Sequence, residues 1–240
     1  MRILAIDSSG LTASVAIVEE EVTIAEYTVN YKKTHSQTLL PMIDEMVKMT
    51  ETDLDTIDAI AVAGGPGSFT GLRIGSATAK GLGLALGKPL VSVPTLEGIA
   101  YNLYGTDKLI CPMMDARRKQ VYTGIYVFSG EDFQILVPQT ACPVEEIIQQ
   151  VNEIGQKQGK SVIFLGDGVP VYREIIREKI QIDSCFAPAH LNRQRAGAVG
   201  ARAFAYIKEN QTQTAAEHVP VYLRKSQAER ELEKKGKTLS

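Results

Sequence analysis

Two turns in the sequence carry residue types that could bind an anion or a metal ion. Asp7, Ser8 and Ser9 stand with Gly10 between two apolar runs, so they are expected at the tip of a hairpin. A carboxylate and two hydroxyls there can line a phosphate or metal site, because short side chains let a ligand approach backbone N–H groups. The same residues are common in a plain β-turn, and that interpretation stays open. Asp115 ends a similar run later in the chain, and together with Asp7, Ser8 and Ser9 it is predicted to contact a phosphate.

The segment 64–73, GGPGSFTGLR, is the most unusual stretch of the chain. It follows an apolar run and precedes a helical pattern, so its glycines suit a close backbone approach and the helix start offers free N–H donors. It is not a Walker A loop, because Leu72 follows Gly71 where that motif requires lysine. Arg73 falls in the first helical turn, where a cation opposes the helix dipole. We expect Arg73 to meet an anion or a partner carboxylate, with a structural salt bridge as the alternative.

Metal ligands and nucleophiles with catalytic spacing are scarce. The histidines and cysteines are His35, His190, His218, Cys111, Cys142 and Cys185. They form no HExxH, HxxxH or CxxC motif, and the chain has no GxSxG elbow, so the sequence predicts neither a metal site nor a catalytic residue. An odd number of cysteines without paired spacing favours a reducing cytoplasm over a disulfide framework.

The composition is that of an ordinary globular protein. The 240 residues are 44% hydrophobic and 22% charged, and the formal net charge is −2. Such a balance gives no global attraction to nucleic acid, so a contact with RNA must be local or supplied by a partner. No run of about 18 apolar residues occurs, so we expect no membrane span.

Apolar periodicity predicts two α/β units, each with the element order β-β-β-α-β-α. The predicted strands are 3–6, 13–18, 23–29, 59–63, 90–93, 110–114, 121–128, 133–137 and 161–165, and the predicted helices are 36–49, 70–86, 96–104, 144–154, 171–177 and 196–208. These patterns place the first unit at 1–105 and the second at 106–240, with a cleft between them. The charged tail from residue 224 to 240 is expected to be solvated.

The first two helices are expected to carry a partner surface. In helix 36–49, Leu39, Ile43 and Val47 are sufficient to fill a core-facing stripe. A second stripe of Met42, Met46 and Met49 is then left for a partner, and flexible thioether side chains suit such an interface.

The next helix has small residues at four-residue spacing. These are Gly71, Gly75, Ala79 and Gly83. A glycine inside a helix costs about 1 kcal/mol relative to alanine, so a close contact must compensate. That contact is either this chain's own sheet or a partner helix, and both alternatives stay open. Together with Arg73, these four residues complete the expected interface.

Several motifs together resemble the bacterial TsaB (YeaZ) family. They are MRILAIDSS at the start, THSQTLLP at 34–41, GGPGSFTGLRIG at 64–75, VPTLEGIA at 93–100, MMDARRKQVY at 113–122 and PVYLR at 220–224. The resemblance runs through nearly the whole chain. It implies the actin/Hsp70/hexokinase-like (ASKHA) fold and a role in making threonylcarbamoyladenosine at position 37 of tRNAs that read codons beginning with A.

The resemblance also implies how the work is divided among subunits. TsaD, a paralogue, transfers threonylcarbamoyl from its adenylate to N6 of the adenosine. This chain is expected to be its non-catalytic partner, with TsaE as a third subunit, and to form a homodimer when TsaD is absent. Contact with tRNA is expected only through the complex. In TsaD the segment matching 95–99 reads HxEGH, whose histidines bind the metal, whereas this chain has Thr95 and Ile99 there.

No cofactor of its own is expected, beyond weak binding of ATP or ADP in the assembled complex. Two other functions remain as alternatives. One is an ATP-dependent small-molecule kinase of the same fold. Such a kinase needs two hairpin tips with an acidic residue that binds a metal ion, and only Asp7 and Asp115 are candidates. The other is a glycoprotease-like metallopeptidase, which lacks ligands.

Overall fold

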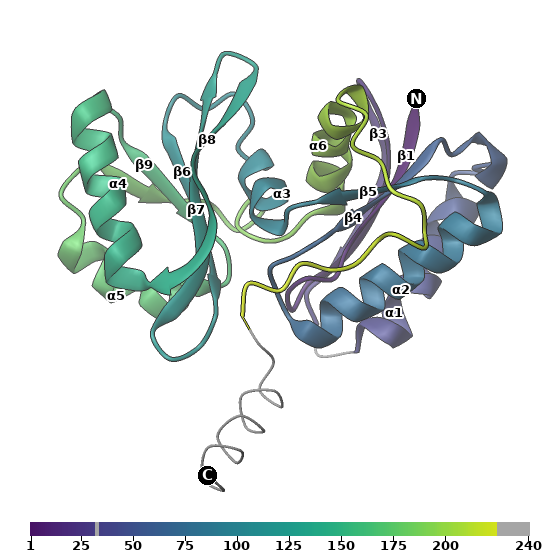
Figure 1. Ribbon diagram of the computed structural model, residues 1–240, viewed down its shortest axis with the longest axis horizontal. Helices are drawn as coiled ribbons and strands as arrows, with labels where there is room; N and C mark the ends of the chain where they lie inside the picture. The colour runs from purple at the N-terminus through teal and green to yellow at the C-terminus, as the bar shows by residue number, and fades with distance from the viewer. Residues whose placement is uncertain (32–33, 225–240) are drawn as a thin grey trace, which may run out of the picture.

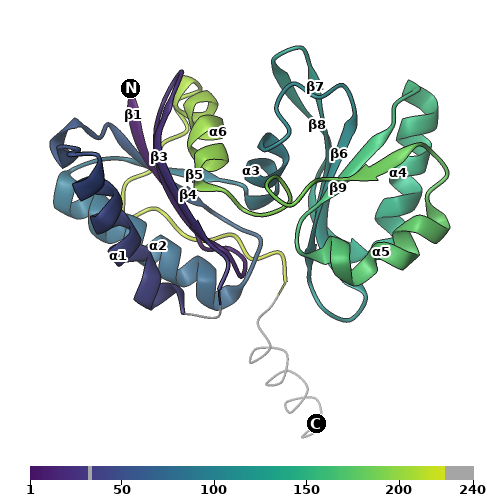
Figure 2. The ribbon, with the colours of Figure 1, turned by 180° about the vertical axis from the view of Figure 1, so that it is seen from behind.

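Two five-stranded sheets, one from each half of the chain, form the frame of the molecule (Figures 1 and 2). The computed structural model describes residues 1–31 and 34–224, so the charged tail expected beyond residue 224 lies outside the described residues. The first sheet consists of β1 (Arg2–Asp7), β2 (Ala13–Glu19), β3 (Thr23–Val29), β4 (Ala59–Ala63) and β5 (Leu90–Val93). The second consists of β6 (Leu109–Asp115), β7 (Gln120–Ser129), β8 (Asp132–Pro143), β9 (Val162–Leu165) and β10 (Ser184–Phe186).

Both sheets have the same topology. Their strand orders are β3-β2-β1-β4-β5 and, counted in the same sense, β8-β7-β6-β9-β10. In each sheet the first three strands are antiparallel neighbours, and the last two continue in parallel. This duplication confirms the expected two-unit, actin-like α/β architecture. Each unit has the order β-β-β-α-β-α-β-α, one strand and one helix longer than the expected repeat. Of these four elements, β5, α3 and α6 were among the predicted ranges, whereas β10 was not.

Within residues 1–31 and 34–224, six helices cover the sheets. They are α1 (His35–Met49), α2 (Phe69–Leu86), α3 (Thr95–Tyr101), α4 (Val144–Gln158), α5 (Gly168–Lys179) and α6 (Ala196–Lys208), and a short 3-10 turn spans Leu54–Thr56. Ser68 caps the start of α2 with its hydroxyl, and Gly87 ends that helix in a left-handed conformation. No helix in the described part of the chain is long and apolar enough to cross a membrane.

The central strands are apolar because they are covered on both faces. All five residues of β4 are buried. On one face Leu4 and Ile60 pack with α1 and α2, and on the other Ile3 and Ala5 pack with α6. A parallel strand that is buried on both faces has a continuous apolar sequence, and β4 could be predicted for this reason.

The two units exchange their last helices. Helix α3, from the first half, packs through Leu96 and Ile99 on the second sheet, while α6 crosses back onto the first sheet. The two helices meet, and Arg202 of α6 donates to the buried carboxylate of Glu97 at 2.9 Å. A cut at residue 105 therefore does not separate the two cores, and the boundaries 1–105 and 106–240 need correction on this point.

Candidate functional site

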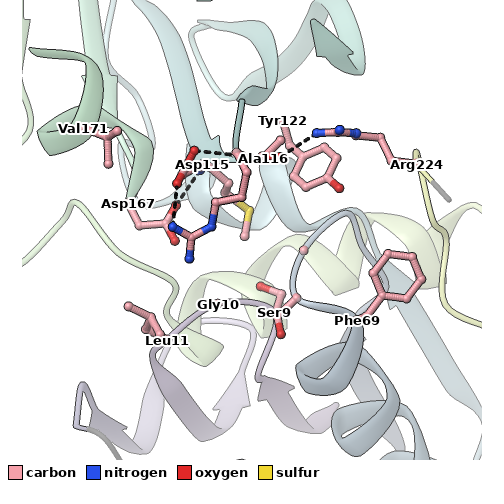
Figure 3. Close-up of a pocket in the computed structure, with 14 residues that line it drawn as sticks. Ser9, Gly10, Leu11, Phe69, Asp115, Ala116, Tyr122, Asp167, Val171 and Arg224 are labelled. Carbon is pink, nitrogen blue, oxygen red and sulfur yellow. Dashed lines mark hydrogen bonds and ion pairs between the residues drawn. The ribbon is translucent and has the colours of Figure 1, made fainter. Parts of the chain in front are cut away.

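A cavity of about 650 Å³ opens between the hairpin tips of the two sheets (Figure 3). Each unit contributes one hairpin tip and the start of one helix to its walls. The lining includes Ser9, Leu11, Phe69, Asp115, Arg117, Tyr122, Asp167 and Arg224. Of the four residues predicted to contact a phosphate, Ser9 and Asp115 line the cavity, whereas Asp7 and Ser8 do not.

Asp7 is a buried carboxylate beneath the first hairpin tip. Its Oδ1 accepts hydrogen bonds from the Ser9 backbone N–H at 2.8 Å and from the Ser9 hydroxyl at 2.6 Å. Its Oδ2 is buried without a partner in the described part of the chain. Burial raises the pKa of Asp7 to about 6, although the Ser9 hydrogen bonds act in the opposite direction. Asp7 therefore fixes the tip from below and does not face a ligand directly.

The glycine-rich segment brings α2 against this tip. The Ser8 hydroxyl donates to the Gly71 carbonyl at 2.8 Å, and the Ser68 backbone N–H donates to the Ser9 carbonyl at 2.7 Å. A Cβ added to Gly71 would lie 2.1 Å from the Ser8 carbonyl oxygen, and one added to Gly75 would lie 2.4 Å from the Ser8 hydroxyl. Close packing within the chain thus accounts for both glycines.

The rest of the small-residue stripe also faces inward. Ala79 is fully buried, and a Cβ on Gly83 would lie 2.4 Å from Leu90. Of the two alternatives left open for this stripe, the structure supports packing on the chain's own sheet. This stripe is therefore not on the surface of the described chain.

The second hairpin tip is organised around Asp115. Its Oδ1 accepts from the Arg117 backbone N–H and from the Tyr172 hydroxyl, each at 2.9 Å. Its backbone N–H donates to Asp167 at 3.2 Å, and burial raises the pKa of Asp167. The Arg117 guanidinium pairs with Asp115 at 3.5 Å. In these contacts the carboxylate of Asp115 holds the turn. Its predicted contact with a phosphate stays a prediction.

Arg73 contacts two aromatic rings within the chain. Its guanidinium lies 5.9 Å from the ring centroids of both Phe69 and Tyr222, and its Nε donates to the Tyr222 hydroxyl at 3.3 Å. The two rings stack with their centroids 4.4 Å apart. Within residues 1–31 and 34–224 Arg73 has no ion pair, so the structural salt bridge is not formed there. Contact of Arg73 with an anion or a partner carboxylate stays a prediction.

The methionine stripe of α1 does not lie on one surface. Met46 is fully buried and Met42 is nearly so, both in the core beneath α1, whereas Met49 is 69% exposed. The core-facing stripe is wider than expected because α1 packs on both the sheet and α2. The expected surface stripe is therefore wrong for Met42 and Met46.

The positions that match the metal-binding histidines have structural roles. The Thr95 hydroxyl accepts a hydrogen bond from the Gly65 backbone N–H at 3.1 Å, and Ile99 is buried in the apolar cluster that joins α3 to the second sheet. These side chains do not fit a metal ion. Within the described residues, no group of three or more His, Cys, Asp or Glu side chains could hold one.

Sequence reasoning missed several residues that line the cavity. Asp167 lies in the Gly166–Gly168 turn after β9, which is the counterpart of the loop before α2 and could have indicated it. Arg224 lines the cavity and belongs to the C-terminal segment, which runs along α2 (Figure 1). Tyr222 of the same segment stacks on Phe69, which also lines the cavity. The position of this segment beside α2 depends on tertiary structure, which hydrophobic periodicity does not predict.

Comparisons with known proteins agree with this architecture. A family model described as TsaD, tRNA N6-adenosine threonylcarbamoyltransferase, matches residues 23–232. The tRNA threonylcarbamoyladenosine biosynthesis protein TsaB of Bacillus subtilis is 33% identical over 95% of this chain and 96% of that protein. The protein of the same name from Haemophilus influenzae is 28% identical over 93% and 94% of the two chains. The chain belongs to the TsaB family.

A solved structure supports membership of the TsaB family independently. YeaZ from Pseudomonas aeruginosa superposes with a TM-score of 0.78 at 26% identity, covering 92% of this chain and 99% of that one. Membership assigns the chain to proteins of tRNA threonylcarbamoyladenosine biosynthesis. The resemblance stated from the motifs is thereby confirmed.

Proposed function

We propose that this member of the TsaB family is a non-catalytic cytoplasmic subunit that supports threonylcarbamoyl transfer to adenosine 37 of tRNA by TsaD, with TsaE as a further subunit. The assignment to a supporting role rests on Thr95 and Ile99, which are engaged in packing where the catalytic paralogue has metal ligands. A chain without those ligands needs another chain to perform the transfer.

The location of the partner surface rests on a glycine on the outer face of α2 that packing within the described chain does not explain. Gly81 is exposed in the middle of the helix, and a Cβ added there would meet nothing within 4 Å. A mid-helix glycine costs about 1 kcal/mol relative to alanine, and no contact within the described chain compensates for it. If a second helix packs closely against α2 at Gly81, the position must lack a side chain, and this would explain the glycine.

Exposed apolar residues also occur on α2 and on the neighbouring helix α1. Leu84 is 73% exposed on α2, and Leu40 is 55% exposed on the neighbouring α1. Ala77, one turn before Gly81, is also exposed. We therefore place the partner surface on Ala77, Gly81, Leu84 and Leu40 rather than on the buried stripes. TsaD, or a second copy of this chain when TsaD is absent, would occupy it.

A nucleotide is not required for this role. Arg117 lines the cavity and pairs with Asp115 where a triphosphate would enter. We expect the chain alone to bind ATP or ADP weakly at most. Any stronger binding would belong to the assembled complex.

Replacement of Gly81 by tryptophan tests the partner surface. Gly81→Trp places a bulky ring on the outer face of α2, so binding to TsaD should weaken at least ~10-fold in sedimentation experiments, and homodimers should dissociate. Lys157→Trp, at an exposed position on α4, is the matched control and should bind normally. Unchanged association of Gly81→Trp would place the interface elsewhere.

A further inference from the structure

We propose that the β6–β7 hairpin tip, together with Arg224, binds the phosphate backbone of a folded RNA. The inference rests on the proposed function, because it takes tRNA as the RNA that this chain encounters. It departs from the expectation that tRNA is reached only through partner subunits.

Three consecutive cations form the end of this hairpin. Arg117, Arg118 and Lys119 are all exposed, and the Arg117 side chain is 88% exposed. The protein as a whole has a net charge of −2, so this concentration of positive charge is local. Local clusters of arginine and lysine are typical of surfaces that bind the phosphate backbone of nucleic acids.

The backbone holds these cations in an uncommon conformation. All three residues have positive φ angles, of 64°, 58° and 57°. Such angles are unfavourable for residues with a Cβ and persist only where the surroundings enforce them. Here the Asp115 carboxylate accepts from the Arg117 N–H, and the Ala116 and Gln120 backbones bond across the turn. The cations are thus presented in advance of binding, which reduces the ordering cost of a contact.

Arg224, from the C-terminal segment, extends the cationic surface. Its guanidinium donates to the Ala116 carbonyl at the base of the hairpin tip. Figure 3 shows this side chain reaching toward Ala116 from the C-terminal segment, with Phe69 on the same side of the cavity. Phe69 stacks on Tyr222, and Arg73 lies beside both rings. Guanidinium groups beside aromatic rings match a ligand that combines phosphates with planar bases.

The carboxylates of the cavity do not oppose such a contact. Asp115 is engaged by Arg117 and Tyr172, and Asp167 accepts the Asp115 N–H with its pKa raised by burial. Both lie at or inside the base of the tip, whereas Arg118 and Lys119 project at its exposed end. The RNA backbone would therefore cross the tip rather than enter the cavity.

Reversal of two charges tests the proposal directly. A labelled, unmodified tRNA transcript is titrated with the full chain at two salt concentrations. Arg118→Glu combined with Lys119→Glu should weaken binding at least ~10-fold and should reduce the salt dependence of log K by roughly 0.7–0.9 for each lost phosphate contact. Lys157→Glu combined with Lys179→Glu makes the same charge change at exposed positions on α4 and α5, and should bind like the unaltered chain.

The same variants are also tested for association with TsaD by sedimentation. The hairpin variant should associate normally, because its substitutions lie on the hairpin tip of the second sheet, whereas the surface proposed for TsaD lies on the exposed residues Ala77, Gly81 and Leu84 of α2. Equal loss of tRNA binding in both double variants, or no loss in the hairpin variant, would overturn the proposal. Loss of TsaD binding in the hairpin variant would overturn it in favour of a protein interface. None of these outcomes depends on whether the chain stimulates transfer, so this proposal and the proposed function can fail separately.

Discussion

At the scale of single residues, Asp7 combines a structural role with a cost in stability. Two hydrogen bonds from Ser9 hold one carboxylate oxygen, while the other is buried without a described partner. Burial raises its pKa from 3.8 to about 6. In the unfolded chain the carboxyl group ionises near its ordinary pKa, so between about pH 4 and pH 6 the folded state binds more protons. The contribution of Asp7 to stability therefore falls as the pH rises through this range.

Replacement of Asp7 by asparagine should remove this pH dependence. Asparagine keeps an oxygen that can accept from Ser9 and carries no charge. Relative to the unaltered chain, the free energy of unfolding of Asp7→Asn should rise by on the order of 3 kcal/mol between about pH 4 and pH 8, mostly below pH 6. Denaturant titrations at a series of pH values measure this difference. A difference that does not change with pH would show that Asp7 is not buried as described.

At the scale of elements, α2 has glycines on two of its faces, and their surroundings differ. Gly71 faces the β1–β2 tip, where a Cβ would lie 2.1 Å from the Ser8 carbonyl oxygen. Gly81 faces outward, with nothing within 4 Å of an added Cβ. The same substitution should therefore have opposite effects on stability at the two positions.

Alanine at each position separates the two roles. Gly81→Ala should stabilise the isolated chain by up to about 1 kcal/mol, because alanine favours the helix and meets no neighbour. Gly71→Ala should destabilise it, because the backbone of the β1–β2 tip must move. Thermal unfolding of both variants checks the pair. The account of α2 fails if Gly71→Ala is as stable as the unaltered chain.

An element could be predicted from the sequence where its own residues and the turn residues beside it determine its ends. Helix α6 and strands β3, β4 and β5 begin and end as expected, because apolar runs and turn residues mark their ends. Strand β10 was not expected, since its three residues are stabilised mainly by pairing with β9.

Helix faces depend on neighbours that a single helix pattern does not identify. The burial of Met46 follows from the contact of α1 with both the sheet and α2. Likewise, Asp115 was expected at the site from its position after a strand, whereas Arg224 reaches it from a segment distant in sequence. Residues at strand ends could be predicted, and residues brought by the chain path could not.

At the scale of the whole molecule, the exchange of α3 and α6 makes the two units depend on each other. Ile3 and Ala5 of the first sheet are covered by α6, and the second sheet is covered by α3. Glu97 and Arg202 join the two helices through a hydrogen-bonded ion pair. Neither half has its complete core without an element of the other.

Expression of the halves tests this interdependence. Residues 1–105 expressed alone should fail to give cooperative unfolding, because the face of the first sheet under α6 would be exposed to water. The same fragment extended by α6 through a flexible linker should recover a cooperative transition. A fully cooperative fragment 1–105 would mean that α6 contributes little to the first core.

The most direct test of the central claim is a reconstituted threonylcarbamoyl transfer reaction. TsaD, TsaE, unmodified tRNA and threonylcarbamoyl-AMP are combined with and without this chain, and the modified adenosine is quantified. We expect strong modification only when this chain and TsaD are both present, no modification by this chain with tRNA and the adenylate alone, and a large loss with Gly81→Trp. Transfer by this chain alone, or transfer that is undiminished when it is omitted, would show that it is not a supporting subunit of TsaD.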